Sequence, residues 1–410
     1  MQTKLAADVM STALGQEADE ILRRCVHCGF CAATCPTYQI LGDELDSPRG
    51  RIYLIKEMLE GKPVTQTTQT HLDRCLTCRN CETTCPSGVE YGKLIDIGRQ
   101  MVEQRVSRPR AEVLKRAALR RVLNSRFFAP AYRLGQMVRD WLPPVFQDKV
   151  QAKREVLSLP DNLSRHGRQV LMLGGCVQPT LMPSIDAATI RVLDRLGIGA
   201  RSVPSASCCG ALNFHLDDQE AARSQMRTNI DAWWGLLNTG EVEALVINAS
   251  GCGAMIKEYG HHLRLDPAYA QKAQFISDKT KDLAEILAPM ASTLRPLLNV
   301  KQLPQKVAFH PPCTLQHWQG LRPLSESLLR EVGLDLAPFE ETHLCCGSAG
   351  AYSVLQPEIA TSLRDRKLDR ISKAEPNMIL SSNVGCIGHL QSGTQTPVRH
   401  WIEAVDQAMG

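Results

Sequence analysis

Short runs of apolar residues recur through the second half of the chain, and small or polar positions follow each of them. The runs RQVLML, EALVINA, KVAF and NMIL end just before Gly174, Ser250, His310 and Ser381, respectively. Runs of this length and composition predict buried strands. Stretches with apolar residues at helical spacing lie between them, such as 357–371. This alternation of strands and helices predicts an α/β region with parallel sheets.

The N-terminal part of the chain shows a different pattern, without the alternation that predicts a strand. The segment SPRGRIYLIKEMLEG predicts one helix, because Ser47 can cap it, Pro48 suits its first turn and Gly61 can end it. Ile52 and Ile55 share one face of this helix. We therefore expect the N-terminal domain to be mainly helical.

The cysteines of the second half repeat at regular positions. In two places a cysteine stands 32 positions before a Cys-Cys-Gly triplet, and each repeat closes with a Gly-Cys pair. The first three cysteines of the repeats are offset by 137 positions and the last by 134. Such a match predicts two copies of one module. The first copy contains Cys176, Cys208, Cys209 and Cys252, and the second contains Cys313, Cys345, Cys346 and Cys386.

Composition narrows the class of protein. With 410 residues, 43% hydrophobic and 22% charged, the chain is typical of soluble globular proteins, and its net charge of +4 argues against a nucleic-acid binder. No apolar run approaches the roughly 20 residues that span a bilayer. Acidic residues near the start argue against a secretory signal, so we expect a reducing, cytoplasmic setting. The 16 cysteines there predict metal or redox chemistry instead of disulfides.

The first eight cysteines form two runs of the pattern C-x2-C-x2-C-x3-C-P, the spacing of bacterial two-cluster ferredoxins. Three cysteines two residues apart can share one tight loop around a cluster, while the fourth leads away to the other cluster. Zinc is the main alternative, but its sites usually need two C-x2-C pairs and no proline after them. The runs therefore predict two [4Fe–4S] clusters, one on Cys25, Cys28, Cys31 and Cys85, the other on Cys75, Cys78, Cys81 and Cys35.

The eight cysteines of the repeats leave several interpretations open. Each set of four could be an additional redox or metal site, holding an unusual iron–sulfur cluster or zinc, or it could be a dithiol or simply packed thiols. A sharp turn at Gly210 or Gly347 would let adjacent cysteines bind one metal. The second repeat also carries His310, His317 and His389, so we expect it to be the more reactive of the two.

A basic segment separates the cysteine runs from the repeats. From residue 99 to 154 the chain has 14 Lys and Arg against 4 Asp and Glu, a net charge of +10. Its arginines alternate with apolar residues and Trp141. Three interpretations remain open: contact with anionic lipid, docking on an acidic partner subunit, or a linker helix with a solvated basic face.

These patterns divide the chain into four segments. A helical ferredoxin-like domain with two clusters is followed by a basic, mainly helical linker and then by an α/β region made of two repeated Cys-Cys-Gly modules. The expected bounds are 1–98 for the cluster domain, 99–165 for the linker, 166–298 for the first module and 299–410 for the second.

The two cysteine runs, the stretch DSPRGR at 46–51 and the two Cys-Cys-Gly repeats together resemble the iron–sulfur subunits of bacterial glycolate oxidase (glycolate dehydrogenase), along essentially the whole chain. The wider group includes the iron–sulfur subunit of anaerobic glycerol-3-phosphate dehydrogenase and subunits of heterodisulfide reductase. In heterodisulfide reductases the modules end in a further C-x2-C. This chain departs from that pattern, because no such cysteine follows Cys252 or Cys386.

The resemblance implies an electron-transfer subunit of an oxidoreductase, without catalytic residues of its own. FAD-binding flavoprotein subunits would oxidise glycolate to glyoxylate, with D-lactate as a further substrate. This chain would pass the electrons to a respiratory quinone, as a peripheral protein on the cytoplasmic side of the inner membrane. The alternatives are the same role in a glycerol-3-phosphate or D-lactate dehydrogenase, and a disulfide reductase acting at the Cys-Cys-Gly sites. The chain has no G-x-G-x-x-G motif for a dinucleotide of its own.

Overall fold

The chain folds into two compact units. In the computed structural model the first unit comprises Met1–Arg116 and Glu341–Lys367, and the second comprises Ala117–Glu340 and Leu368–Gly410. No helix within the described part of the chain is long and apolar enough to cross a bilayer. The stretch 142–155 of the expected basic linker lies outside the described residues, which are 1–125, 127–141, 156–160 and 163–410.

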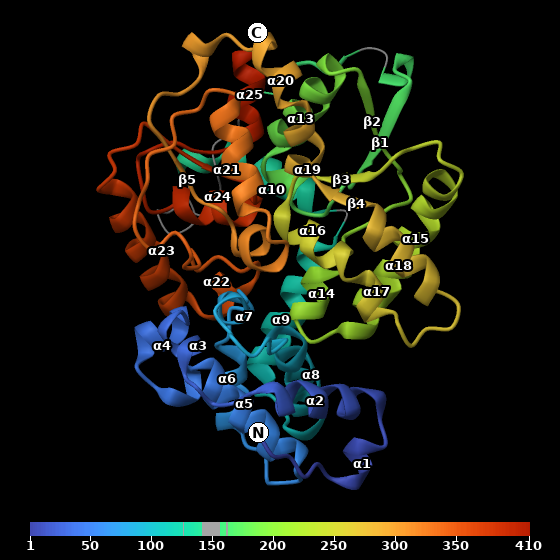
Figure 1. The fold of residues 1–410 in the computed structure, drawn as a ribbon, viewed down its shortest axis with the longest axis vertical. Helices are drawn as coiled ribbons and strands as arrows, with labels where there is room; N and C mark the ends of the chain where they lie inside the picture. The colour runs from blue at the N-terminus through green and yellow to red at the C-terminus, as the bar shows by residue number, and fades with distance from the viewer. Residues whose placement is uncertain (126, 142–155, 161–162) are drawn as a thin grey trace. The chain divides into compact units, whose positions relative to one another are not determined.

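The first unit consists of short helices around one apolar core (Figure 1). Helix α5 (Pro48–Leu59) begins as predicted, because the Ser47 hydroxyl accepts a hydrogen bond from the Gly50 N–H at 3.0 Å. Its Ile52 and Ile55 are buried in the core. The other helices of this part are α1 (Ala7–Met10), α2 (Ala13–Arg24), α3 (Phe30–Ala33), α4 (Pro36–Leu41), α6 (Gln66–Asp73), α7 (Asn80–Thr83) and α8 (Tyr91–Arg105).

A distant stretch of sequence, 341–367, completes the first unit. The Tyr352 hydroxyl donates to the Arg74 carbonyl oxygen at 2.9 Å, and the Asn80 side chain donates to the His343 carbonyl oxygen at 3.2 Å. Both bonds join this stretch to the cysteine-rich loops. The stretch 341–367 contains α22 (Tyr352–Leu355). The boundaries between the two units fall within two helices, α9 (Arg110–Leu123) and α23 (Pro357–Ser372).

The first module of the second unit contains a four-stranded parallel sheet in the order β2-β1-β3-β4. Leu171 of the first strand lies opposite Arg201 on one side and Leu245 on the other. The predicted apolar runs thus form the two central strands. The four strands are β1 (Arg168–Met172), β2 (Ile198–Ser202), β3 (Leu245–Ile247) and β4 (Thr280–Asp282).

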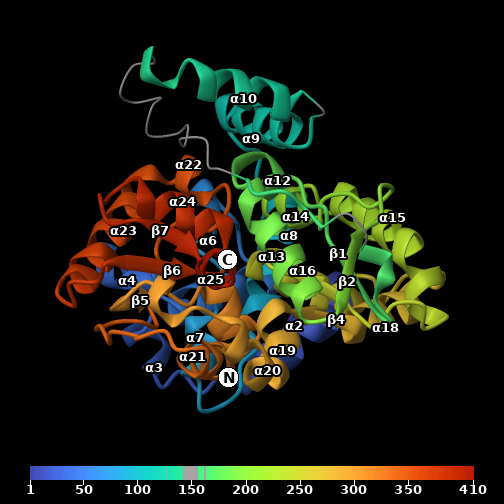
Figure 2. The same cartoon turned by 90° about the horizontal axis from the view of Figure 1, so that it is seen from above.

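Helices cover both faces of this sheet (Figure 2). The long helix α15 (Gln219–Asn238) packs Met226, Ile230 and Trp233 into a core that also includes the sheet residues Leu171 and Leu245. The helix that returns the chain from β1 to β2 lies on the other face, as right-handed crossovers require. The helices of the module are α12 (Gln178–Leu181), α13 (Pro183–Arg195), α14 (Ala211–His215), α15 (Gln219–Asn238), α16 (Ser250–Lys257), α17 (Tyr259–His262), α18 (Ala270–Lys279), α19 (Leu283–Leu287) and α20 (Ala291–Leu294).

A second parallel sheet, of three strands in the order β5-β6-β7, lies in the same unit. The two modules are joined by polar contacts between helices, where Arg191 pairs with Asp406 and the Ser184 hydroxyl donates to Glu403 at 2.6 Å. The prediction of an α/β region with parallel sheets is therefore confirmed. The remaining elements are α10 (Phe128–Met137), β5 (Val307–Phe309), α21 (Arg322–Glu331), β6 (Met378–Ser381), α24 (Val384–Gln391), β7 (Val398–His400) and α25 (Trp401–Ala408).

Candidate metal centres

The two cysteine runs of the first unit follow the same backbone course. His27 and Gly29 of the first run have φ angles of 57° and 85°, and Thr77 and Arg79 at the matching positions of the second have 53° and 58°. Left-handed conformations cost energy in residues other than glycine and gather where a structure must hold a particular loop shape. Their recurrence at matching positions indicates that both loops meet the same structural requirement.

Two hollows lie against these loops. Their empty volumes, which include space open to solvent, are about 440 Å³ and about 290 Å³. Pro48, Cys81 and Tyr91 line both, so the two hollows share a wall. The first is also lined by Cys25, Cys28, Cys31 and Cys85, and the second by Cys35, Cys75 and Cys78.

The thiols in these hollows crowd one another. Burial and the neighbouring Cys25 raise the pKa of Cys31 to about 11. Burial and the neighbouring Cys78 raise the pKa of Cys81 well above its usual range. Thiolates held this closely repel one another unless a cation lies among them, and thiolate sulfur is the ligand of iron–sulfur clusters. The residues of both hollows therefore fit an iron–sulfur cofactor.

Polar side chains approach two sulfurs of the second hollow. The Thr37 hydroxyl oxygen lies 3.3 Å from the Cys35 sulfur, and the Arg51 Nη1 atom lies 4.0 Å from it. The Tyr91 hydroxyl donates to the Cys75 sulfur at 3.7 Å. Polar groups of this kind orient a metal-binding cysteine and tune the negative charge on its sulfur. Sequence patterns had not singled out Thr37 or Tyr91, and had not given Arg51 a role in the site.

In the first module, the structure brings together the four cysteines that the repeat predicted to form one set. Cys176 follows β1, and Cys252 lies in the first turn of α16, directly after β3. Hydrogen bonds from the thiols of Cys176 and Cys209 lower the pKa of Cys208 to about 3. The neighbouring thiols of Cys208 and Cys252, together with burial, raise the pKa of Cys209 well above its usual range. The four sulfurs of the set therefore lie close enough together to shift one another's pKa values.

Two buried side chains fix the Cys-Cys turn of this module. The Tyr259 hydroxyl donates to the Cys209 carbonyl oxygen at 2.8 Å, and the Asn229 amide donates to the Cys208 carbonyl oxygen at 2.9 Å. The same amide donates to the Tyr259 oxygen at 3.1 Å. The turn ends at Gly210, where φ is 92°, so the glycine provides the sharp turn that its place in the triplet predicted. Nothing local in the sequence had identified Asn229 or Tyr259.

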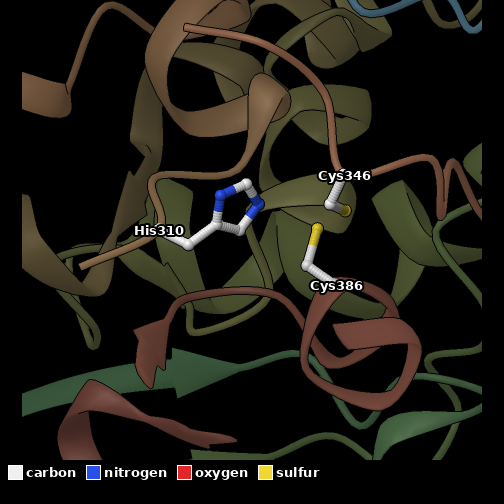
Figure 3. A group of neighbouring side chains, drawn as sticks. All are labelled: His310, Cys346 and Cys386. Atoms are coloured by element: carbon white, nitrogen blue, oxygen red, sulfur yellow. The ribbon is translucent and has the colours of Figure 1, made fainter. Parts of the chain in front are cut away.

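The cysteines of the second module are divided between the two units. Cys313 follows β5, and Cys386 lies in α24, both in the second unit, whereas Cys345 and Cys346 belong to the first. The buried side chains of His310 and Cys386 offer ligand atoms within 4.8 Å of each other. Figure 3 shows this imidazole and this thiol. His310, one of the three histidines of the second repeat, thus lies beside a cysteine sulfur of that repeat.

Comparison with known proteins gives two matching families and several relatives. A family described as a 4Fe-4S dicluster domain matches residues 21–89, and a cysteine-rich domain family matches residues 170–257 and 307–391. The glycolate oxidase iron-sulfur subunit of Escherichia coli (strain K12) is 51% identical over 410 residues, which cover 100% of this chain and 99% of the relative.

More distant relatives cover less of the chain. A probable glycolate oxidase iron-sulfur subunit of Bacillus subtilis (strain 168) is 28% identical over 402 residues, covering 91% of this chain and 89% of the relative. Lactate utilization protein A of Geobacillus thermodenitrificans (strain NG80-2) is 28% identical over 217 residues, covering 52% of this chain and 85% of the relative.

Proposed function

Because the chain belongs to the family of glycolate oxidase iron–sulfur subunits, we propose that it carries electrons from glycolate to a respiratory quinone. FAD-binding partner subunits oxidise glycolate to glyoxylate in this proposal, and D-lactate is a further substrate. The observation that carries it is the pair of hollows lined by eight cysteines. A flavin releases two electrons and an iron–sulfur cluster accepts one, so two adjacent clusters suit the transfer.

The proposed cofactors are two [4Fe–4S] clusters with crossed ligand sets. The fourth cysteine of each run completes the set of the other run, as the ferredoxin spacing suggests. The lining of the hollows supports this arrangement, because the first hollow takes Cys85 from the second run and the second takes Cys35 from the first run. The ligands are Cys25, Cys28, Cys31 and Cys85 for one cluster and Cys35, Cys75, Cys78 and Cys81 for the other.

Iron counting and electron paramagnetic resonance on the anaerobically purified complex test the proposal. We expect at least about eight irons with matching labile sulfide per chain. Cys28→Ala and Cys78→Ala should each reduce the iron content and abolish electron delivery to quinone, while glycolate still reduces the flavin. Val26→Ala is the matched control, because Val26 is 66% exposed within the same loop. Zinc without sulfide, or quinone reduction that survives both cysteine variants, would contradict the proposal.

We further propose that the first module holds an additional metal ion or cluster on Cys176, Cys208, Cys209 and Cys252. The support is the joined set of four sulfurs with a low-pKa thiolate at Cys208, because thiolates are the metal-binding form of cysteine. The test is the metal content of Cys208→Ala. Loss of metal, with the signals of the N-terminal clusters intact, is expected, and unchanged iron and zinc content would refute this site.

A peripheral contact with the cytoplasmic face of the inner membrane is also proposed, through the basic segment. Around α10 the side chains of Leu134, Met137 and Trp141 are 61%, 84% and 91% exposed, in a stretch that also carries Arg133 and Arg139. Exposed apolar and basic groups together suit an anionic lipid surface. The complex should sediment with anionic vesicles and less so after Trp141→Ala. Equal sedimentation with zwitterionic vesicles, or no effect of the substitution, would contradict the lipid contact.

A further inference from the structure

A buried cage of charged side chains lies beside the second hollow. Asp46 at its centre is fully buried, and its carboxylate accepts hydrogen bonds from Arg51 at 3.2 Å and Arg74 at 2.9 Å. The His71 Nδ1 atom lies 3.0 Å from the same carboxylate. Burying charged groups is costly unless each is paired. Asp46 and Arg51 are both buried and paired here, while the Arg74 side chain is 32% exposed.

Arg51 connects this cage to a proposed cluster ligand. Its side chain is 1% exposed, and its Nε donates to the His71 carbonyl oxygen at 2.7 Å. Its Nη1 donates to the Thr37 hydroxyl at 3.0 Å and lies 4.0 Å from the Cys35 sulfur. The guanidinium is therefore held from three sides against one sulfur of the second hollow, which it and Thr37 both line.

The charges of the cage do not cancel. Arg51 and Arg74 contribute two positive charges and Asp46 contributes one negative charge, so the arginines outnumber the carboxylate by one. Arg51 and Asp46 are removed from solvent, so their fields are screened far less than those of surface groups. A cluster held in the second hollow would thus lie beside a fixed positive charge.

The first hollow has a different charged neighbour. Arg49 lines it, two residues before Arg51, but its side chain is 38% exposed and it pairs with Glu44 at 2.8 Å. An exposed ion pair is electrically almost neutral at a distance and is screened by water and salt. The two hollows therefore differ in burial and in the charge beside them, although their cysteine runs have the same spacing.

We infer that Arg51 and Asp46 set the reduction potential of the cluster on Cys35, Cys75, Cys78 and Cys81, and that Arg51 makes it the more easily reduced of the two. The inference rests on the proposed ligand sets. A buried positive charge stabilises the form of the cluster that carries the additional electron. With clusters bound as proposed, this difference would favour the passage of one electron from the first hollow to the second, with no bond made or broken and no proton moved.

The test is a potentiometric titration of the anaerobically purified complex, followed by electron paramagnetic resonance. Arg51→Gln removes the positive charge, so it should lower one of two midpoint potentials by at least about 59 mV, a tenfold change in the one-electron equilibrium. Asp46→Asn removes the negative charge and should raise the same midpoint. Arg51→Lys, which keeps the charge, should recover most of the loss.

Lys56→Gln is the matched control, because it also removes one positive charge from the same helix, at a residue that lines neither hollow. It should change the one-electron equilibrium of either cluster less than about threefold. Shifts of the same sign in Arg51→Gln and Asp46→Asn, or no shift in either with both cluster signals intact, would overturn the inference. A wild-type complex without two [4Fe–4S] signals would instead overturn the proposed function, so the two failures are distinguishable.

Discussion

Tyr259→Phe tests whether the Cys-Cys turn of the first module depends on its buried support. The change removes one hydroxyl from a fully buried ring and leaves the ring's packing in place. The Cys209 carbonyl oxygen loses a donor at 2.8 Å, while Asn229 keeps its bond to the Cys208 carbonyl oxygen. A buried carbonyl left without a partner costs about 1–3 kcal/mol, so we expect a loss of about 2 kcal/mol in the free energy of unfolding.

Thermal unfolding of the full chain, followed by circular dichroism, measures this loss. For a unit of this size, 1 kcal/mol corresponds to a shift in Tm of about 2–4 °C, so Tm should fall by about 4–8 °C. Tyr269→Phe is the matched control, since its hydroxyl donates to the Asp231 carboxylate at an exposed site, at 2.7 Å. It should change stability by less than about 0.5 kcal/mol. Equal Tm values for the two variants would refute the reasoning.

Two further predictions concern a buried acid and the two triplet glycines. Burial raises the pKa of Asp282 to about 6 from 3.8, so the stabilisation it provides is present below about pH 4 and is lost as the pH rises through 6. Asp282→Asn keeps the hydrogen bond from the Ala284 N–H but removes the titratable carboxyl. In urea titrations, the free energy of unfolding of the variant relative to the wild type should therefore rise by about 1 kcal/mol between about pH 5 and about pH 8. A difference that stays constant with pH would contradict this. Gly210→Ala should cost about 1–2 kcal/mol, because φ is 92° there. Gly347→Ala should cost more by the same measurement, because its Cβ would also lie 2.4 Å from the Ala360 carbonyl oxygen, and the reverse order would contradict the steric argument.

The secondary structure of this chain was largely accessible from its sequence, because each signal is local. The apolar runs before Gly174, Ser250, His310 and Ser381 became the strands of two parallel sheets. Ser47 capped the helix that it was expected to cap. The alternation of apolar runs with helical stretches involves only residues that are close together in the sequence. It can therefore be recognised without knowing the tertiary contacts.

Contacts between distant segments were not accessible in the same way. The hydrogen bond from Tyr352 to Arg74 joins residues 278 positions apart and helps assign the stretch 341–367 to the first unit. No periodicity reports such a pairing. Asn229 and Tyr259 escaped prediction for the same reason, because their partners are backbone oxygens of a turn that lies elsewhere in the sequence.

The role of Arg51 was missed although a signal was present. Arg51, Ile55 and Met58 follow one another at helical spacing, so the arginine lies on the apolar face of α5. Arginine is rarely buried without a partner, and an arginine on an apolar face therefore predicts a buried acid nearby. Asp46, five positions earlier, is that acid.

The shared wall between the two hollows has a kinetic consequence. Electron tunnelling slows exponentially with distance, and the two cavities are adjacent, since Pro48, Cys81 and Tyr91 line both of them. For clusters held as proposed, exchange between them would be much faster than the encounters that bring electrons in and take them out. The rate of overall turnover would then be set by docking and release of the redox partners at the protein surface. The two clusters would stay in redox equilibrium with each other throughout.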